Sequence, residues 1–125
     1  MTRVLVADDD PIMRELVATT LIRSGHQIAT AGSGAEAIAM IDDDSFDVVV
    51  ADIFMPEGTG IELLISLRAR RNEVPFICIS GGDGDLFRPY AATMISLGAH
   101  AVLRKPFTPE QLLTAVNEFE FGDTK

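Results

Sequence analysis

Five short apolar segments recur along the chain, and a helical pattern follows each of them. The segments lie at residues 4–7, 27–31, 46–51, 76–79 and 100–103. Apolar runs of this length, several of them rich in Val, Ile and Leu, are typical of strands that are buried on both faces. Alternation of strands with helices favours a parallel sheet with right-handed crossovers. We therefore expect an α/β fold with a five-stranded parallel sheet in the order 2-1-3-4-5 and helices on both faces.

Residues that favour helix starts separate these segments. Asp10 precedes Pro11, which pairs an N-cap with proline at the first helical position. Ser33 and Gly60 open two further helices, and residues 108–111 (Thr-Pro-Glu-Gln) form a capping box. These signals predict three helices between strands and one helix after the last strand.

Apolar spacing predicts how the helices pack and where the remaining one begins. Between the fourth and fifth strands, we expect a loop over residues 83–88 and a short helix over residues 89–97, opened by Pro89. The first helix is expected to bury Met13, Leu16, Val17 and Leu21, and the last one Leu112, Leu113, Val116 and Phe119.

Composition limits the class of protein. A chain of 125 residues with 47% hydrophobic content is long enough for one domain with a real core, and we expect a single domain over residues 1–125. Its net charge of -9 argues against nucleic-acid binding through a basic face and against docking on an anionic membrane. Cys78 is the one cysteine, so no disulfide forms within the chain and a reducing, cytoplasmic location fits.

Four of the predicted strands end in polar groups. Asp8 and Asp9 follow the first strand, Asp52 follows the third, Ser80 follows the fourth and Lys105 follows the fifth. The carboxyl ends of parallel strands meet at one edge of a sheet, which is where open α/β proteins bind ligands. We expect these five side chains to converge there.

This set of groups is suited to one kind of chemistry. Three carboxylates on one edge are costly to ionise without a cation, and oxygen ligands favour Mg²⁺, with Mn²⁺ as a possible substitute. A carboxylate nucleophile, a metal, the Lys105 ammonium and the Ser80 hydroxyl are the parts needed for phosphoryl transfer to an aspartate. Asp52 is the candidate nucleophile.

The sequence closely resembles the receiver domain of two-component response regulators, from Val4 to about Phe121. The resemblance is carried by residues 4–11 with Arg14, Asp52-x-x-Met55-Pro56-x-x-x-Gly60, Ser80-Gly81 and Lys105-Pro106-Phe107. It implies that Asp52 accepts a phosphoryl group from a sensor histidine kinase or a histidine phosphotransfer protein. It further implies that Lys105 pairs with the phosphoryl oxygens, that Ser80 reports their presence, and that Mg²⁺ is held by Asp8, Asp9, Asp52 and the backbone carbonyl of Phe54.

The implied protein is a signalling switch rather than a turnover enzyme. Its output would be altered contact with a downstream protein through a surface within residues 89–119. The resemblance also implies a cis Lys105-Pro106 bond. We expect a single-domain regulator, although the sequence also allows a piece of a longer protein.

Departures from the family pattern affect the switch. Val102 stands where the family usually has an aromatic residue that moves with the hydroxyl, and a bulky Phe54 stands where polar residues are common. Our hypothesis is that Phe54 alters the access of hydrolytic water. His26 and His100 match no functional role and are interpreted as ordinary strand-edge residues.

Three other functions stay open at this point. A haloacid-dehalogenase-type phosphatase would use the first aspartate of the run 8–10 as its nucleophile but leaves Asp52 unexplained. A flavodoxin-like FMN carrier shares the fold, but the acidic run would repel the FMN phosphate. A receiver that binds its partner constitutively, without phosphorylation, is the third.

Overall fold

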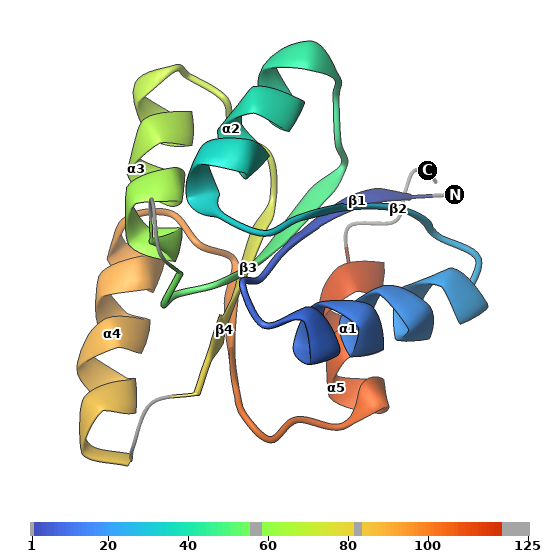
Figure 1. Ribbon diagram of the computed structural model, residues 1–125. Coiled ribbons are helices and arrows are strands. Elements are labelled where there is room, and N and C mark those ends of the chain that lie inside the picture. Colours follow the sequence, from blue (N-terminus) through green and yellow to red (C-terminus); the bar gives the residue numbers. More distant parts are fainter. Residues whose placement is uncertain (1, 56–58, 82–83, 119–125) are drawn as a thin grey trace.

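The computed structural model describes residues 2–55, 59–81 and 84–118, and these form five strands that alternate with five helices (Figure 1). The strands pair only in parallel, in the order β2-β1-β3-β4-β5, which confirms the predicted fold. The elements are β1 (Arg3–Ala7), α1 (Pro11–Arg23), β2 (Gln27–Ala31), α2 (Gly34–Asp43), β3 (Val48–Asp52), α3 (Gly60–Ala69), β4 (Phe76–Ser80), α4 (Gly84–Ser96), β5 (Ala101–Arg104) and α5 (Pro109–Asn117).

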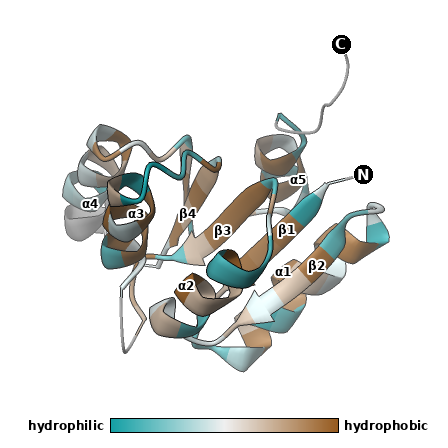
Figure 2. Cartoon of the chain, turned by 90° about the horizontal axis from the view of Figure 1, so that it is seen from above, coloured by the Kyte–Doolittle hydropathy of each residue, from teal (hydrophilic) through white to brown (hydrophobic). Residues whose placement is uncertain are grey.

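Helices cover both faces of the sheet. In Figure 1, α1 and α5 lie together on one side, whereas α2, α3 and α4 lie on the other. Each side has its own apolar core: Val17, Leu21 and Leu112 belong to the first, and Leu64 and Met94 belong to the second. Every residue of β3 and β4 is buried, and the strands appear as the hydrophobic centre of the molecule in Figure 2. The continuous apolar runs in the sequence therefore reflect burial on two faces.

The register of the sheet aligns the carboxyl ends of the central strands. Ala7 of β1 pairs with Ala51 of β3, so the residues that follow them, Asp8 and Asp52, emerge at the same level. On the other side of β3, Asp52 pairs with Ile79, one residue before Ser80. The predicted convergence of polar groups at one edge is thus a consequence of strand pairing.

Side-chain caps start the helices where the sequence predicts them. The Asp10 side chain accepts a hydrogen bond from the Ile12 N–H, and Ser33 accepts one from the Glu36 N–H. Thr59 and Thr108 each form a complete capping box, so Thr59 is the cap that precedes Gly60. Gly60 itself lies so close to β3 that a Cβ there would stand 2.4 Å from the Asp52 carbonyl oxygen.

The structure corrects the boundaries of α4 and the strand ends. Residues 84–88 are helical, so the expectation of a loop over residues 83–88 is wrong, and the helix is longer than predicted. Pro89 lies inside α4 rather than at its start. Pro89 has no N–H and so removes one intrahelical hydrogen bond, while Met94 of the same helix is buried in the core. β3, β4 and β5 also each end one residue later than predicted.

Leu16 is another correction. Its side chain is 55% exposed, because the buried stripe of α1 is narrow and consists of Val17, Ala18 and Leu21. The sequence-based assignments that involve residues 56, 82, 83, 119 and 121 lie outside the described residues.

The two histidines differ from each other. His26 is buried, not a plain strand-edge residue, and its Nε2 lies 3.0 Å from Oδ1 of Asn117, which connects the α1–β2 turn to α5. His100 is exposed and its Nδ1 accepts a hydrogen bond from the Phe76 N–H.

Candidate functional site

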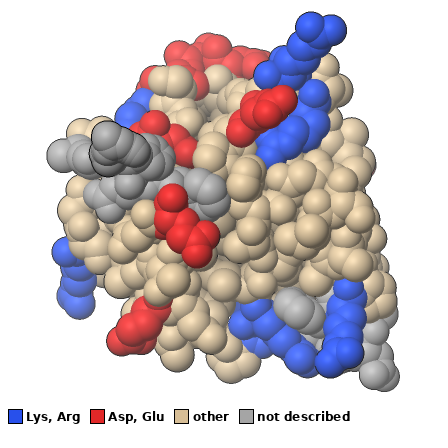
Figure 3. Space-filling view, turned by 180° about the vertical axis from the view of Figure 1, so that it is seen from behind, with Lys and Arg blue, Asp and Glu red and all other residues tan. Residues whose placement is uncertain are grey.

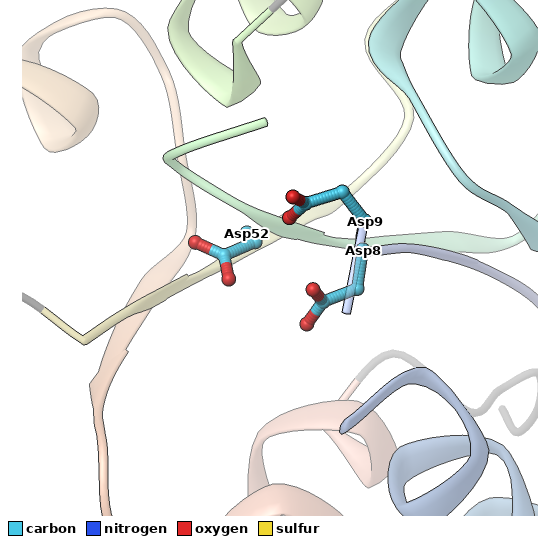
Figure 4. A group of neighbouring side chains, drawn as sticks. All are labelled: Asp8, Asp9 and Asp52. Atoms are coloured by element: carbon cyan, nitrogen blue, oxygen red, sulfur yellow. The ribbon is translucent and has the colours of Figure 1, made fainter. Parts of the chain in front are cut away.

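Three carboxylates meet at the carboxyl edge of the sheet. Asp8 and Asp9 follow β1 and Asp52 ends β3, and one oxygen from each lies within 4.8 Å of the other two (Figure 4). Figure 4 shows the three carboxylate groups gathered around a shared space. Asp8 and Asp52 are buried and Asp9 is exposed, so the cluster is open to solvent on the Asp9 side.

Asp8 has an oxygen that the described residues leave without a hydrogen bond. Its Oδ1 accepts from the Asp10 N–H at 2.9 Å, but its buried Oδ2 has no partner. Burial raises the pKa of Asp8; the bond from Asp10 opposes this shift, and the negative charge of Asp52 adds to it. An unpaired, buried, negatively charged oxygen is an unfavourable arrangement unless a cation completes it.

Lys105 supplies a positive charge next to Asp52, on the other side from the carboxylates of Asp8 and Asp9. Its Nζ donates to Asp52 Oδ2 at 2.8 Å, and both side chains are shielded from solvent. Burial acts against the ammonium, but the bond to Asp52 and the charges of Asp52 and Asp8 outweigh it and raise the pKa of Lys105. The Lys105-Pro106 bond is cis, as the family resemblance implies.

The backbone also contacts Asp52. The Phe54 N–H donates to Asp52 Oδ1 at 3.0 Å, so each carboxylate oxygen of Asp52 has one donor. The Phe54 side chain is 44% exposed, and its ring contacts the Tyr90 ring on α4. Tyr90 does not stand out in the sequence, since nothing in its local pattern indicates a neighbour across the fold.

Ser80 lies at the end of β4 and is completely buried. Its carbonyl oxygen accepts from the Lys105 N–H at 2.8 Å, which fixes the start of the Lys105 segment against β4. At the next residue, a Cβ on Gly81 would stand 3.1 Å from Cδ of Lys105. The structure therefore brings all five predicted side chains to the same edge of the sheet.

Arg14 is a further neighbour of the cluster. It was noted in the sequence only as part of a motif, but its Nη1 donates to the Asp8 carbonyl oxygen at 2.7 Å. Arg14 is in the first half of α1, so this bond ties the helix to the backbone that carries the two acidic residues. Its position one turn after the Asp10 cap was the signal that it faces back toward β1.

The carboxylate cluster fits a hard divalent cation. All its side-chain ligands are oxygens, and the unpaired Oδ2 of Asp8 is a free acceptor in a buried position. Mg²⁺ typically takes one or two carboxylates and keeps several waters, which suits a cluster that is open on one side.

Other features of the surface and core agree with the limits set by composition. Cys78 is buried in β4, and burial with the nearby Asp52 charge raises the pKa of its thiol to about 12. On the face shown in Figure 3, acidic and basic side chains are interspersed, without one continuous basic surface among the described residues. None of the helices in the described part of the chain has the length and apolar character to cross a bilayer.

Comparisons with known proteins agree with this geometry. The family model of the response regulator receiver domain matches residues 4–117. The chain is 32% identical to the response regulator SaeR of Staphylococcus aureus over 117 residues, which are 94% of this chain and 50% of SaeR.

Two solved structures are similarly close. The receiver domain of the Francisella response regulator 1452 has a TM-score of 0.88 at 32% identity and covers 95% of this chain and 96% of its own. The chemotaxis protein CheY4 of Vibrio cholerae has a TM-score of 0.86 at 30% identity, with 96% and 99% covered.

The chain belongs to the receiver domain family of two-component response regulators. Members of this family are signalling domains, and the order of strands and the acidic cluster are those expected of one. The chain spans about half the length of the curated relatives that it matches.

Proposed function

We propose that this protein is a phosphorylation-activated switch in which Asp52 accepts a phosphoryl group. The observation that carries the proposal is the pairing of Asp52 with Lys105 at 2.8 Å, next to the carboxylates of Asp8 and Asp9. This arrangement gives one carboxylate a cationic neighbour on one side and a candidate metal site on the other. The donor is a phosphohistidine of a sensor kinase or a phosphotransfer protein.

The transfer step needs little covalent chemistry from the protein. An oxygen of Asp52 attacks the phosphorus, an O–P bond forms, and the P–N bond to the donor imidazole breaks with its electron pair returning to nitrogen. Lys105 releases its bond to Asp52 and pairs with the phosphoryl oxygens. Asp8, Asp9, Asp52 and the Phe54 carbonyl would hold Mg²⁺, which when bound neutralises charge on the phosphoryl group.

Asp8 and Asp9 therefore serve to attract a cation, while Lys105 holds the carboxylate of Asp52 in position. Ser80 then reports the phosphoryl group by hydrogen bonding to it. The output is altered contact with a downstream protein in the cytoplasm, and the chain turns over no external substrate. The effect of Phe54 on hydrolytic water stays a prediction.

Intact-mass measurement with acetyl phosphate tests the proposal. We expect the wild-type protein to gain one phosphoryl group when Mg²⁺ is present and none when EDTA removes it. Asp52→Asn should gain nothing under either condition. Asp10→Ser is the matched control, because it removes a neighbouring carboxylate but keeps a side chain able to cap α1.

Two results would contradict the proposal. Equal phosphorylation of wild type and Asp52→Asn would place the acceptor elsewhere. No phosphorylation of the wild type, together with failure to bind beryllofluoride, would favour a receiver that binds its partner constitutively.

A further inference from the structure

Asp8 is held at three points, and a side chain of α1 supplies one of them. Its N–H donates to the Ala31 carbonyl oxygen at the end of β2 at 3.0 Å, and its Oδ1 accepts from the Asp10 N–H at 2.9 Å. Nη1 of Arg14 donates to its carbonyl oxygen at 2.7 Å. The buried Oδ2 is left unpaired by the described residues. The three bonds together therefore determine where Oδ2 points.

The bond from Arg14 acts on both acidic residues that follow β1. The carbonyl group that accepts it belongs to the peptide between Asp8 and Asp9, so a rotation of this peptide would turn both carboxylates relative to Asp52 (Figure 4). A hydrogen bond from a charged guanidinium is stronger than one between neutral groups. Arg14 therefore restrains the peptide that sets the geometry of two of the three carboxylates in the cluster.

The guanidinium of Arg14 is itself confined by the loop between β2 and α2. Arg14 is half-buried, and a Cβ at Gly32 of that loop would stand 3.2 Å from Nη1 of Arg14 and 3.6 Å from Oε1 of Glu36. The same Glu36 oxygen accepts from the Gly32 N–H at 2.7 Å, which fixes the loop on α2. A side chain at position 32 would press on the guanidinium. Arg14 thus lies between the loops that follow β1 and β2, in a defined position.

We propose that Arg14 is a positioning residue for the cation site. Its bond to the Asp8 carbonyl oxygen holds the carboxylates of Asp8 and Asp9 in the arrangement that binds Mg²⁺. In this role Arg14 acts through the two aspartates and contacts neither the cation nor the phosphoryl group. The inference rests on the proposed function for the identity of the cation and for its use in phosphoryl transfer.

The charge of Arg14 and its positioning role affect Mg²⁺ binding in opposite directions. Loss of the positive charge alone would strengthen binding, because a guanidinium near the site repels a cation. Loss of the bond to the Asp8 carbonyl oxygen would weaken binding, because the peptide between Asp8 and Asp9 is then free to rotate. Groups that orient metal ligands from outside the coordination sphere typically contribute about 10–100-fold to metal affinity. The sign of the change in affinity therefore separates the two effects.

A Mg²⁺ titration followed by the NMR shifts of the backbone amides, without a phosphodonor, measures the dissociation constant. In Arg14→Gln, whose side chain is too short to reach the Asp8 carbonyl oxygen, we expect this constant to rise about tenfold. Arg23→Gln is the matched control, because it removes the same charge from an exposed position about 13 Å farther along α1 and should leave the constant unchanged. Arg14→Lys keeps a charged donor, so its constant should rise by a smaller factor.

Phosphorylation by acetyl phosphate provides a second measurement. In Arg14→Gln the Mg²⁺ concentration that gives half of the maximal rate should rise about tenfold, in step with the dissociation constant. The rate at saturating Mg²⁺ should stay within about twofold of the wild type, because the bond between Asp52 and Lys105 is kept. Urea unfolding in EDTA measures the stability of each variant separately, so a general loss of stability is not mistaken for a loss of Mg²⁺ affinity.

The outcomes distinguish the role of Arg14 from the proposed function. Mg²⁺ binding by Arg14→Gln that equals or exceeds that of the wild type overturns the role, even when Asp52 is phosphorylated normally. Equal weakening in Arg14→Gln and Arg23→Gln, or a wild type that binds no Mg²⁺, also overturns it. Weaker binding in Arg14→Gln alone supports the role, even if acetyl phosphate fails to modify the wild type and the proposed function is wrong. If Arg14→Gln does not fold, wild-type affinity in Arg14→Lys overturns the role.

Discussion

Asp8 carries the most unfavourable charge among the described residues of the site. Its buried Oδ2 has no donor, and burial raises its pKa. Since the folded-state pKa is above its usual value, the ionised group destabilises the fold at neutral pH. This cost is relieved as the pH falls toward the ordinary range of an aspartate. The cost is consistent with a residue retained for cation binding rather than for stability.

Replacing Asp8 therefore has a predictable effect. We expect Asp8→Asn to stabilise the metal-free protein by about 1 kcal/mol, or a melting temperature raised by roughly 4 °C, because the amide removes a buried charge. Thermal unfolding in EDTA measures this. Added Mg²⁺ should then stabilise the wild type but not the variant.

A surface carboxylate provides the control. Asp43→Asn removes one charge at an exposed position of α2 and should change stability by less than about 0.5 kcal/mol. A variant Asp8→Asn that melts below the wild type in EDTA would mean that the carboxylate is already compensated within the protein.

At the scale of elements, Arg68 connects the end of α3 to two neighbouring segments through hydrogen bonds. Its Nη1 donates to the carbonyl oxygens of Asn72 at 2.9 Å and Val74 at 3.1 Å, and its Nη2 donates to that of Gly98 at 2.8 Å. The guanidinium of Arg68 thus connects α3 to the loop before β4 and to the turn between α4 and β5. A basic residue in the last turn of a helix also complements the negative end of the helix dipole.

Arg68→Lys tests this connection. A lysine keeps the charge but has no planar fork, so it cannot serve all three carbonyl groups, and we expect a loss of about 1–2 kcal/mol in the free energy of unfolding. Urea titration measures the loss. Arg70→Lys is the matched control, because the exposed Arg70 pairs with Asp42 at the surface and should cost under about 0.5 kcal/mol. Equal losses in the two variants would contradict the connecting role.

At the scale of the whole molecule, the parts that the sequence predicts well are those governed by local pattern. Apolar runs give the five strands, and the caps at Asp10, Ser33 and Thr108 give three helix starts. The polar strand ends predict the site, because parallel pairing must bring them together. These features depend on residues close in sequence plus one rule of topology.

The features that the sequence does not predict depend on contacts between distant residues. Leu16 has the period of a buried residue, but its exposure depends on how narrowly α1 meets the sheet. Pro89 is a poor helix residue locally, yet α4 continues through it. His26 meets Asn117, which is 91 residues away, and no local pattern indicates that bond.

The pH dependence of stability also depends on a contact between residues that are distant in the sequence, His100 and Phe76. Burial and the charge of Arg68 lower the pKa of His100, and its Nδ1 accepts from the Phe76 N–H at 3.2 Å. The folded protein therefore binds a proton at His100 less readily than the unfolded chain does. The contribution of His100 to stability is therefore complete above about pH 6.5, the ordinary pKa of histidine. It is lost as the pH falls through the lower pKa that His100 has in the folded protein.

We expect the free energy of unfolding to decrease as the pH is lowered from about 7.5 to about 5.5, the interval around the ordinary histidine pKa. In His100→Asn the decrease should be smaller, because an amide oxygen replaces the Nδ1 acceptor but does not titrate. Urea titrations of both proteins across this interval measure the difference. Identical pH profiles would contradict this role of His100, because they would show that losing the bond from the Phe76 N–H on protonation costs no measurable stability.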